Sequence, residues 1–184
     1  VDSTPLRVCK NQRIHIHKVF KGIAQRGKCS MGWFFGFKLH LICNEKGELL
    51  NFMITPGDVD DRKPLEYKAF IDFIYGKLFG DKGYIGKNLF QRLFVDGIQL
   101  ITKLKSNMKG ALMSVSDRLL LRKRAIIETV NDELKNIAQV EHSRHRCFDN
   151  FIVNLLGAIA AYCLFPKKPR INVQRNFDTQ LALF

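Results

Sequence analysis

Two features are missing from this sequence: the cysteine pairs of a metal-binding or disulfide-bonded module, and an apolar run long enough to span a membrane. The five cysteines include no Cys-x-x-Cys pair and are odd in number, which argues against a zinc finger and a disulfide framework. They favour a reducing cytoplasm. The apolar stretch at residues 151–165 is shorter than the roughly twenty residues that cross a bilayer, so we expect a buried helix and no membrane partner.

Acidic residues are also scarce. Thirty Lys and Arg residues against seventeen Asp and Glu residues give a formal net charge of +13, which favours a polyanionic partner, with nucleic acid as the leading candidate. In residues 1–40, Asp2 is the only acid beside eight bases: Arg7, Lys10, Arg13, Lys18, Lys21, Arg26, Lys28 and Lys38. We interpret this segment as a basic surface or arm, although generic solubilising charge would give the same count.

The pattern of apolar residues predicts one mixed α/β unit. The chain has 184 residues, 46% of them hydrophobic, which is enough for one sizeable core. We predict, in chain order, strand 33–44, strand 49–54, helix 60–74, strand 77–79, helix 87–96, strand 98–102, helix 117–137 and helix 149–165. The domain is expected to cover residues 1–165, with a basic loop at 103–116 and a basic C-terminal tail at 166–184.

The helix predicted at 117–137 carries a charged stripe. At 100° per residue, one narrow stripe holds Leu121, Arg124, Glu128 and Lys135. The opposite side holds the predicted core residues Ile126, Val130, Leu134 and Ile137. The stripe therefore predicts an outward Arg-Glu-Lys surface, and an Arg124–Glu128 pair on a solvated face is the alternative interpretation.

Two further acids are candidates for a functional site. Asp81 follows a short apolar strand, where open α/β sheets place functional groups, and the glycines beside it allow close approach of a substrate. A turn or cap aspartate is the alternative. Asp2 precedes Ser3 in what we interpret as the end of a strand that begins upstream of Val1. Three carboxylates in a basic chain suit divalent cations that activate and stabilise the oxygens of a phosphodiester, while the bases hold the polyanion.

The residues around these acids resemble the motifs of one enzyme family. Arg124, Glu128 and Lys135 have the spacing of the Tyr-x2-Arg-x3-Glu-x6-Lys signature of DDE transposases from bacterial insertion sequences. The segment 80–84 (Gly-Asp-Lys-Gly-Tyr) resembles their Asp-x-Gly-Tyr motif, and Asp2 resembles their first catalytic aspartate. Residues 55–61 resemble the segment before their first helix. Leu121 stands where the signature has Tyr, which leaves open how the cleaved strand is handled.

The resemblance implies a fold, a site and a partner. The fold would be RNase H-like (retroviral-integrase-like), an α/β domain with a mixed central sheet flanked by helices. The catalytic and metal-binding residues would be Asp2, Asp81 and Glu128, holding Mg²⁺ or, as a substitute, Mn²⁺. Arg124 and Lys135 would contact transposon-end phosphates, and we expect Lys103 and Lys105 to follow a phosphate backbone. The protein would act in the bacterial cytoplasm, at the nucleoid, as a homodimer on double-stranded DNA.

The expected reaction is cleavage at a transposon end followed by strand transfer into target DNA. Two rival interpretations stay open: an RNase H-like nuclease that does not join strands, and a non-catalytic DNA-binding protein derived from a transposase. Among the remaining residues, Lys38 and His40 share a strand face and either line a groove or belong to a half-exposed strand. Trp33 and its neighbouring phenylalanines would either stack on bases or pack within the sheet.

Overall fold

The structure of the protein is a computed structural model that describes residues 1–103, 114–141 and 145–171. Its strands are β1 (Asp2–Cys9), β2 (Gln25–Cys29), β3 (Gly32–Cys43), β4 (Leu49–Pro56), β5 (Gly76–Gly80) and β6 (Ile98–Thr102). Its α-helices are α1 (Lys68–Ile71), α2 (Lys87–Val95), α3 (Val115–Lys123), α4 (Ile126–Asn136) and α5 (Phe148–Cys163), with short 3₁₀ helices η1 (Asn11–Ile16), η2 (Lys63–Glu66) and η3 (Lys82–Tyr84). The domain is thus a mixed α/β unit, as the sequence predicts.

The larger sheet is built around β3. Along one edge β3 pairs antiparallel with β1, and along the other it pairs antiparallel with both β2 and β4. Strand β2 lies opposite residues 32–36 and β4 opposite residues 37–43, so these two strands follow one another end to end. They meet at Gly27 and Gly57, where a methyl group on Gly27 would overlap the Gly57 carbonyl oxygen.

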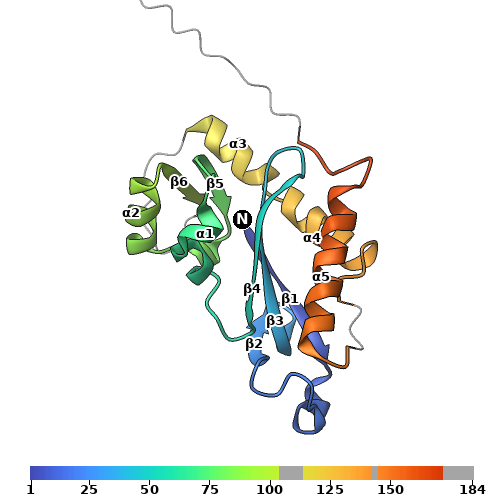
Figure 1. Ribbon diagram of the computed structural model, residues 1–184. Coiled ribbons are helices and arrows are strands. Elements are labelled where there is room, and N and C mark those ends of the chain that lie inside the picture. The colour runs from blue at the N-terminus through green and yellow to red at the C-terminus, as the bar shows by residue number, and fades with distance from the viewer. Residues whose placement is uncertain (104–113, 142–144, 172–184) are drawn as a thin grey trace, which may run out of the picture.

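The smaller sheet is a parallel pair, β5 and β6, connected through helix α2. It lies beside the beginning of β1 (Figure 1). The Val1 backbone nitrogen donates a hydrogen bond to the Phe79 carbonyl oxygen at 2.8 Å, and the Lys77 ammonium pairs with Asp117 at 2.6 Å. The first contact joins β5 to β1, and the second fastens α3 to β5.

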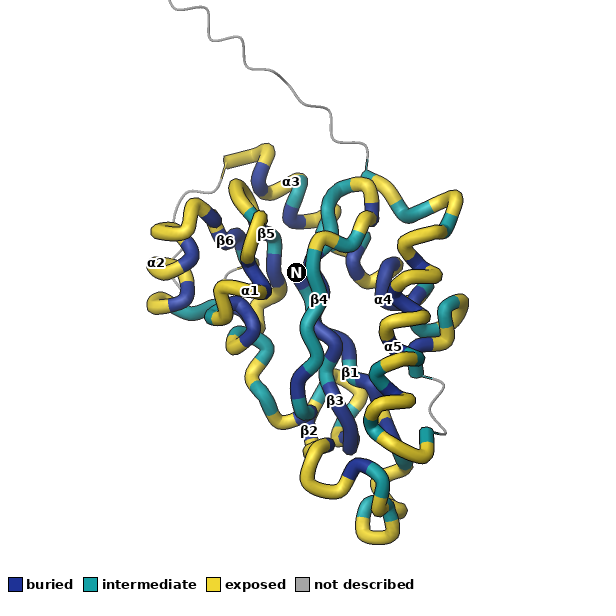
Figure 2. The backbone as a smooth tube through the Cα atoms, in the orientation of Figure 1, coloured by how far each residue is buried: buried dark blue, intermediate teal, exposed yellow. Residues whose placement is uncertain are grey.

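Two apolar clusters stabilise these layers. In the first, the β1 and β3 side chains of one sheet face pack against α4 and α5, which cover that face (Figures 1 and 2). The second lies between the other face and the β5–β6 unit and includes Ile42, Phe70, Leu78 and Leu93. The alternating residues Phe35, Phe37, Leu39 and Leu41 of β3 lie in the first cluster, and Ile42, on the other face of the strand, lies in the second. Within the described residues, no helix has the length and apolar character of a membrane span.

The helix predicted at 60–74 is wrong. The chain forms the 3₁₀ helix η2 and the four-residue helix α1 instead, because Tyr67 between them is extended, with φ −88° and ψ 121°. Phe73, an apolar residue within the predicted helix that we expected on its buried face, has a positive φ of 61° and is 90% exposed. Asp60 does not cap a helix, since its carboxylate accepts hydrogen bonds from the backbone and side chain of Arg62.

The helix predicted at 117–137 is interrupted. Helix α3 ends at Lys123 and α4 begins at Ile126, because the Ile127 and Glu128 amides bond three residues back, to Arg124 and Ala125, as in a 3₁₀ turn. The break changes which side chains share a face. Leu121 is buried rather than on the outward stripe, Ile137 is 63% exposed, and Ile127 takes its place in the core.

The remaining elements match the predictions within a few residues, except at the beginning of the chain. The prediction that Asp2 ends a strand is wrong, because Asp2 is the first residue of β1. Strand β2 was not predicted, since its sequence, Gln-Arg-Gly-Lys-Cys, has no apolar alternation. The basic segment 1–40 is therefore mostly part of the sheet and not a free arm.

The close approach of β2 and β4 yields a stability test. We expect Gly27→Ala to lower the free energy of unfolding by about 1–3 kcal/mol or more, since the new methyl group would meet the Gly57 backbone and lie 2.7 Å from the Phe34 ring. Urea denaturation measures the change. Gly157→Ala in α5, where the methyl group meets open space, should instead stabilise by about 0.5–1 kcal/mol. Equal effects of the two substitutions would contradict the packing of the two strands.

Candidate active site

Asp2 stands at the first position of β1, beside helix α4. The Asn131 side-chain amide donates a hydrogen bond to Asp2 Oδ2 at 3.1 Å. Burial raises the pKa of the Asp2 carboxyl, and the nearby Asp81 charge adds to this, while the Ser3 backbone amide and the Arg124 guanidinium act in the opposite direction. The carboxylate is therefore partly desolvated but within electrostatic range of two other candidate residues.

Asp81 and Glu128 lie on either side of one guanidinium. Asp81 directly follows β5, and Glu128 is in the first turn of α4. Arg124 Nη2 lies 3.7 Å from Asp81 Oδ1 and 3.5 Å from Glu128 Oε1. Both carboxylates are more than half exposed, whereas the Arg124 side chain is 15% exposed. The two acids thus face solvent while sharing a partly buried cation.

The position of Arg124 follows from the break between α3 and α4. On an unbroken helix Arg124 and Glu128 would form only a pair on one exposed face. In the structure Arg124 is the C-cap of α3, and its guanidinium reaches Asp81 on the neighbouring β5–β6 unit as well. Two of the three predicted acids, Asp81 after β5 and Glu128 on α4, accordingly contact one arginine, and Asp2 on β1 lies within electrostatic range of it.

Asn131 is a residue that the sequence analysis missed. It is 8% exposed, it lies almost one turn beyond Glu128 in α4, and its Oδ1 atom is buried without a hydrogen-bond partner among the described residues. Its partner Asp2 is 129 positions away in the chain, so no local pattern identifies the pair. The one available signal is helical spacing from Glu128 on α4.

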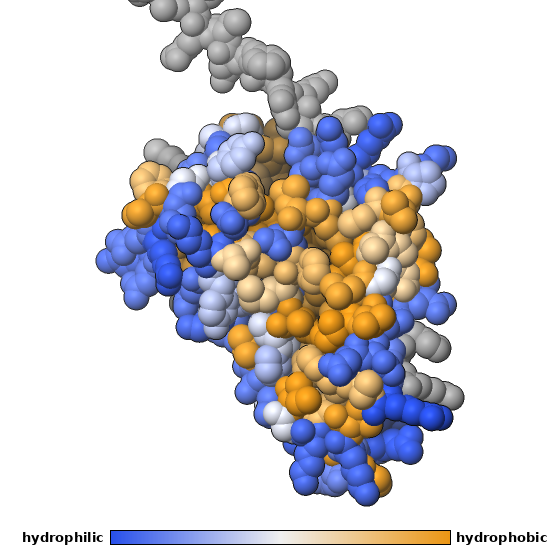
Figure 3. Space-filling model, in the orientation of Figure 1, coloured by the Kyte–Doolittle hydropathy of each residue, from blue (hydrophilic) through white to orange (hydrophobic). Residues whose placement is uncertain are grey.

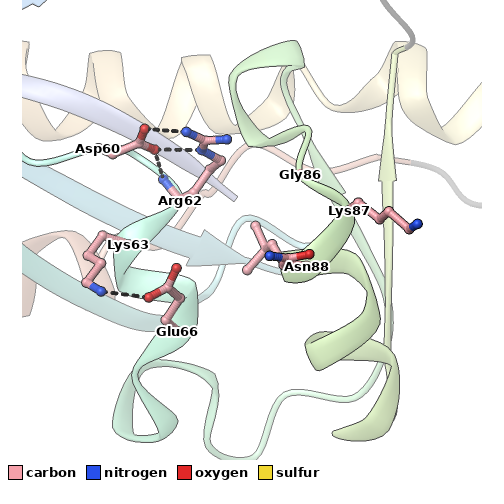
Figure 4. A pocket seen from close by; sticks show the side chains of 8 residues that line it. Asp60, Arg62, Lys63, Glu66, Gly86, Lys87 and Asn88 are labelled. Carbon is pink, nitrogen blue, oxygen red and sulfur yellow. Dashed lines mark hydrogen bonds and ion pairs between the residues drawn. The ribbon is translucent and has the colours of Figure 1, made fainter.

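The segment that carries Asp81 is anchored on both sides. Tyr84, in η3, is 2% exposed, and its burial raises the pKa of the phenol. On the other side, Arg62 Nη1 donates to the Ile85 carbonyl oxygen at 3.3 Å while the same guanidinium pairs with Asp60 (Figure 4). The cavity beside this pair measures about 460 Å³ and has none of the three acids in its lining.

Lys38 and His40 do not line a groove. Lys38 pairs with Asp61 at 2.9 Å and donates to the Val59 carbonyl oxygen at 2.8 Å. His40 is 1% exposed, bonds Thr55 at 2.8 Å, and has a pKa lowered to about 4 by burial. Lys38 therefore fastens the segment after β4 to the sheet, whereas His40 joins β3 to β4 within the sheet.

The predicted phosphate-binding residues have different surroundings. The Lys135 ammonium donates to the Pro5 carbonyl oxygen at 3.1 Å and lies 3.2 Å from Glu141, so it joins α4 to β1. Lys103 is exposed just after β6, and Lys105 lies outside the described residues. Trp33 is 57% exposed, whereas the two phenylalanines after it are buried.

A mixed α/β domain that brings two exposed acids to one arginine, with a third acid within electrostatic range, in a chain of net charge +13, has the features of a nucleic-acid-processing domain. The family model described as "Transposase DDE domain" matches residues 1–148, and the chain belongs to this family. The search of curated proteins and the search of solved structures found no match. DDE transposases act on DNA and use divalent metal ions.

The acids fit such an ion in their chemistry. Asp2, Asp81 and Glu128 offer the hard oxygen ligands that Mg²⁺ prefers, and Asn131 Oδ1 is an additional oxygen without a partner. As the side chains stand, no group of three His, Cys, Asp or Glu residues in the described ranges has a metal-holding arrangement, since Arg124 lies between two of the acids. A cation beside Asp2 would counter the burial that raises its pKa.

The raised pKa predicts that Asp2 lowers stability. An acid with a folded-state pKa above its unfolded value releases its proton more easily when unfolded, so stability falls as the pH rises through that interval. Asp2→Asn should therefore raise the free energy of unfolding at pH 7 by on the order of 1 kcal/mol. This gain should shrink below about pH 4, where the Asp2 carboxyl is protonated and neutral in both the folded and the unfolded chain. Urea denaturation at several pH values measures this. Asp132→Asn, at an exposed position of α4, is the control and should change little.

Proposed function

We propose that this domain catalyses metal-dependent DNA cleavage at transposon ends and strand transfer into target DNA. The observation that carries the proposal is the contact of Asp81 and Glu128 with Arg124, with Asp2 within electrostatic range of Arg124 and Asp81, from three elements far apart in the chain. An ordinary solvated helix face would explain an Arg124–Glu128 pair but not the approach of Asp81 from the β5–β6 unit or of Asp2 from β1. The family match supports the transposase assignment independently of this geometry.

We also propose that the fold is RNase H-like. Strands β2 and β4 occupy one edge of β3, β1 occupies the other, and the Val1–Phe79 hydrogen bond brings β5 beside β1. The resulting order supports a single mixed sheet with helices on its two faces. With β2 and β4 counted as one edge strand, the acids lie on the first strand, after the fourth strand and on a late helix, which is the placement that the resemblance implies.

The roles of the acids follow from their positions. Asp2, Asp81 and Glu128 would hold the Mg²⁺ ions, with Mn²⁺ as a substitute; when bound, such ions activate the attacking oxygen and stabilise the leaving oxygen of a phosphodiester. Asn131 holds the Asp2 carboxylate in place through its amide. The exposure of Asp81 and Glu128 leaves their outer oxygens open to a substrate. These features allow a phosphodiester to reach the acids without any opening of the core.

The neighbouring bases would bind the DNA strand. Arg124 is positioned to move from the two carboxylates to a phosphate, because its guanidinium lies at longer-than-ideal distances from both. Lys135 would add a positive charge beside β1. Lys103 and Lys105 remain predicted backbone contacts, and a homodimer on double-stranded DNA, with one copy at each transposon end, remains our expectation for the active assembly.

Substitution of the acids tests the proposal. Asp2→Asn, Asp81→Asn and Glu128→Gln should each lower strand cleavage at least about a thousandfold, because each removes a charged ligand with little change of volume. Cleavage is measured on a duplex carrying the element's own terminal sequence, with Mg²⁺. The matched control, Asp132→Asn, removes an exposed acid from the same helix and should retain cleavage. Wild-type cleavage by Asp81→Asn would refute the assignment.

The same preparations separate the two rival functions. A nuclease without strand transfer would cleave the end but leave target DNA unjoined. A non-catalytic DNA-binding protein would bind with a steep salt dependence and give no metal-dependent cleavage at all. Buried Leu121, at the position of the signature Tyr, makes the fate of the cleaved strand the step most open to change.

A further inference from the structure

A second charged surface lies at the other end of β1 from the acids. It consists of Lys10, Asn11, Arg26, Lys28 and Trp33, and we name it the Trp33 surface. These residues come from the turn before η1 and from the β2–β3 hairpin, at the lower end of the molecule in Figure 1. Figure 3 shows that this end is mostly hydrophilic.

The only tryptophan of the chain has two cations of β2 beside its ring there. The Arg26 guanidinium carbon lies 5.8 Å and the Lys28 ammonium 5.9 Å from the centre of the Trp33 ring, which is 57% exposed. An exposed indole offers a stacking surface to a base, and the two cations beside it place positive charge where the phosphate of that base would lie.

The backbone under this surface is fixed. The Asn11 side-chain amide donates to the Trp33 carbonyl oxygen at 2.8 Å, and β2 pairs with β3 in continuous register from Gln25 to Cys29. A hollow of about 320 Å³ lies beside the ring, lined by residues that include Lys10 and Asn11. The surface is therefore preorganised, which lowers the entropy cost of binding a ligand.

The charge of the surface favours a polyanion over a protein partner of mixed charge. No acid occurs in the sequence between Asp2 and Glu45. In the part of the chain that the structure describes, no carboxylate lies within ion-pair distance of Lys10, Arg26 or Lys28. These exposed bases are thus available to phosphates.

We propose that the Trp33 surface is a second DNA-binding surface, which grips the phosphate backbone through Arg26 and Lys28 and packs Trp33 against a base or sugar. The seven residue steps along β1 from Asp2 to Cys9 separate the surface from Asp2 by roughly 24 Å at about 3.4 Å per step. A duplex lying along β1 would cover that distance in about seven base pairs. The identity of the nucleic acid as DNA rests on the proposed function, whereas the presence of the surface does not.

Because the chain has one tryptophan, its fluorescence reports this contact directly. A 30-base-pair duplex added in EDTA, without metal and hence without cleavage, should change the Trp33 emission and protect it from acrylamide. The change should saturate together with the anisotropy of a dye-labelled duplex. Emission and acrylamide quenching that stay the same at saturating DNA would overturn the proposal, and this is also the outcome that a protein partner predicts.

A charge-matched pair of variants tests the phosphate contacts. Arg26→Gln with Lys28→Gln should weaken duplex binding at least about tenfold at 100 mM salt and reduce the slope of log affinity against log salt by about 1.8. The control, Lys68→Gln with Arg92→Gln, removes the same charge from exposed positions of α1 and α2 and should change affinity less than twofold. Equal losses in both double variants would show a nonspecific charge effect and overturn the proposal.

Failure of the Trp33 proposal can be distinguished from failure of the proposed function. If Asp81→Asn retained cleavage, the acid assignment would fail, but the Trp33 signal in EDTA would still identify a DNA-binding surface. If the acid variants lost cleavage while Trp33 gave no signal, the catalytic assignment would stand and the second surface would fall. Trp33→Phe, which keeps a ring, should retain more affinity than Trp33→Ala, and equal affinity of the two would exclude a packing role for the ring.

Discussion

The arrangement of the site depends on a single shared counter-ion, the Arg124 guanidinium. Without a cation among them, carboxylates from β1, β5 and α4 would repel one another, and the desolvation of Asp2 would add to the cost. Arg124 lies close enough to Asp81 and Glu128 to offset that repulsion, yet at 3.7 and 3.5 Å it makes neither a tight nor a bidentate pair. A loose pair is suited to exchange, since a phosphate or a metal ion can replace one of its members at modest cost.

Contacts of the surrounding fold hold this arrangement in place. The β5–β6 unit contacts the main sheet through the Val1–Phe79 hydrogen bond, while α3 is tied to β5 by Lys77 and Asp117. On the opposite side, Lys135 joins α4 to the Pro5 carbonyl of β1. The Val1–Phe79 contact lies one residue from Asp2 and two from Asp81, and the Lys135–Pro5 contact lies about two helical turns from Glu128 and three residues from Asp2. Each acid is therefore fixed relative to the next by a contact made nearby in the chain. The residues that fix the positions of the acids are therefore different from the acids that face the solvent.

Much of the fold could be predicted from the sequence, because a local pattern of apolar residues marks most of its strands. The alternation of Phe35, Phe37, Leu39 and Leu41 identified β3, which pairs with three other strands. Strand β2 has no such pattern and forms because β3 offers it an edge. The interruption between α3 and α4 could not be predicted either, since both segments have good helical periodicity, whereas in the structure α3 packs beside β5 and β6 and α4 packs in the first apolar cluster. Among the site residues, Asp2, Asp81 and Glu128 were reached through motif resemblance, whereas Asn131 depends on a contact across 129 positions.

The interruption also bears on Leu121, which stands where the family signature has a tyrosine. On a straight helix that position would share the outward stripe with Arg124 and Glu128, and a ring there would reach the bound strand. In this chain α3 turns toward the β5–β6 unit before the stripe begins, and Leu121 is 5% exposed. Replacing it with tyrosine would place a hydroxyl in an apolar layer and would not restore a surface contact. The absence of an outward ring at this position thus follows from the backbone geometry as well as from the residue type, and the single tryptophan of the chain, Trp33, is exposed in another part of the molecule.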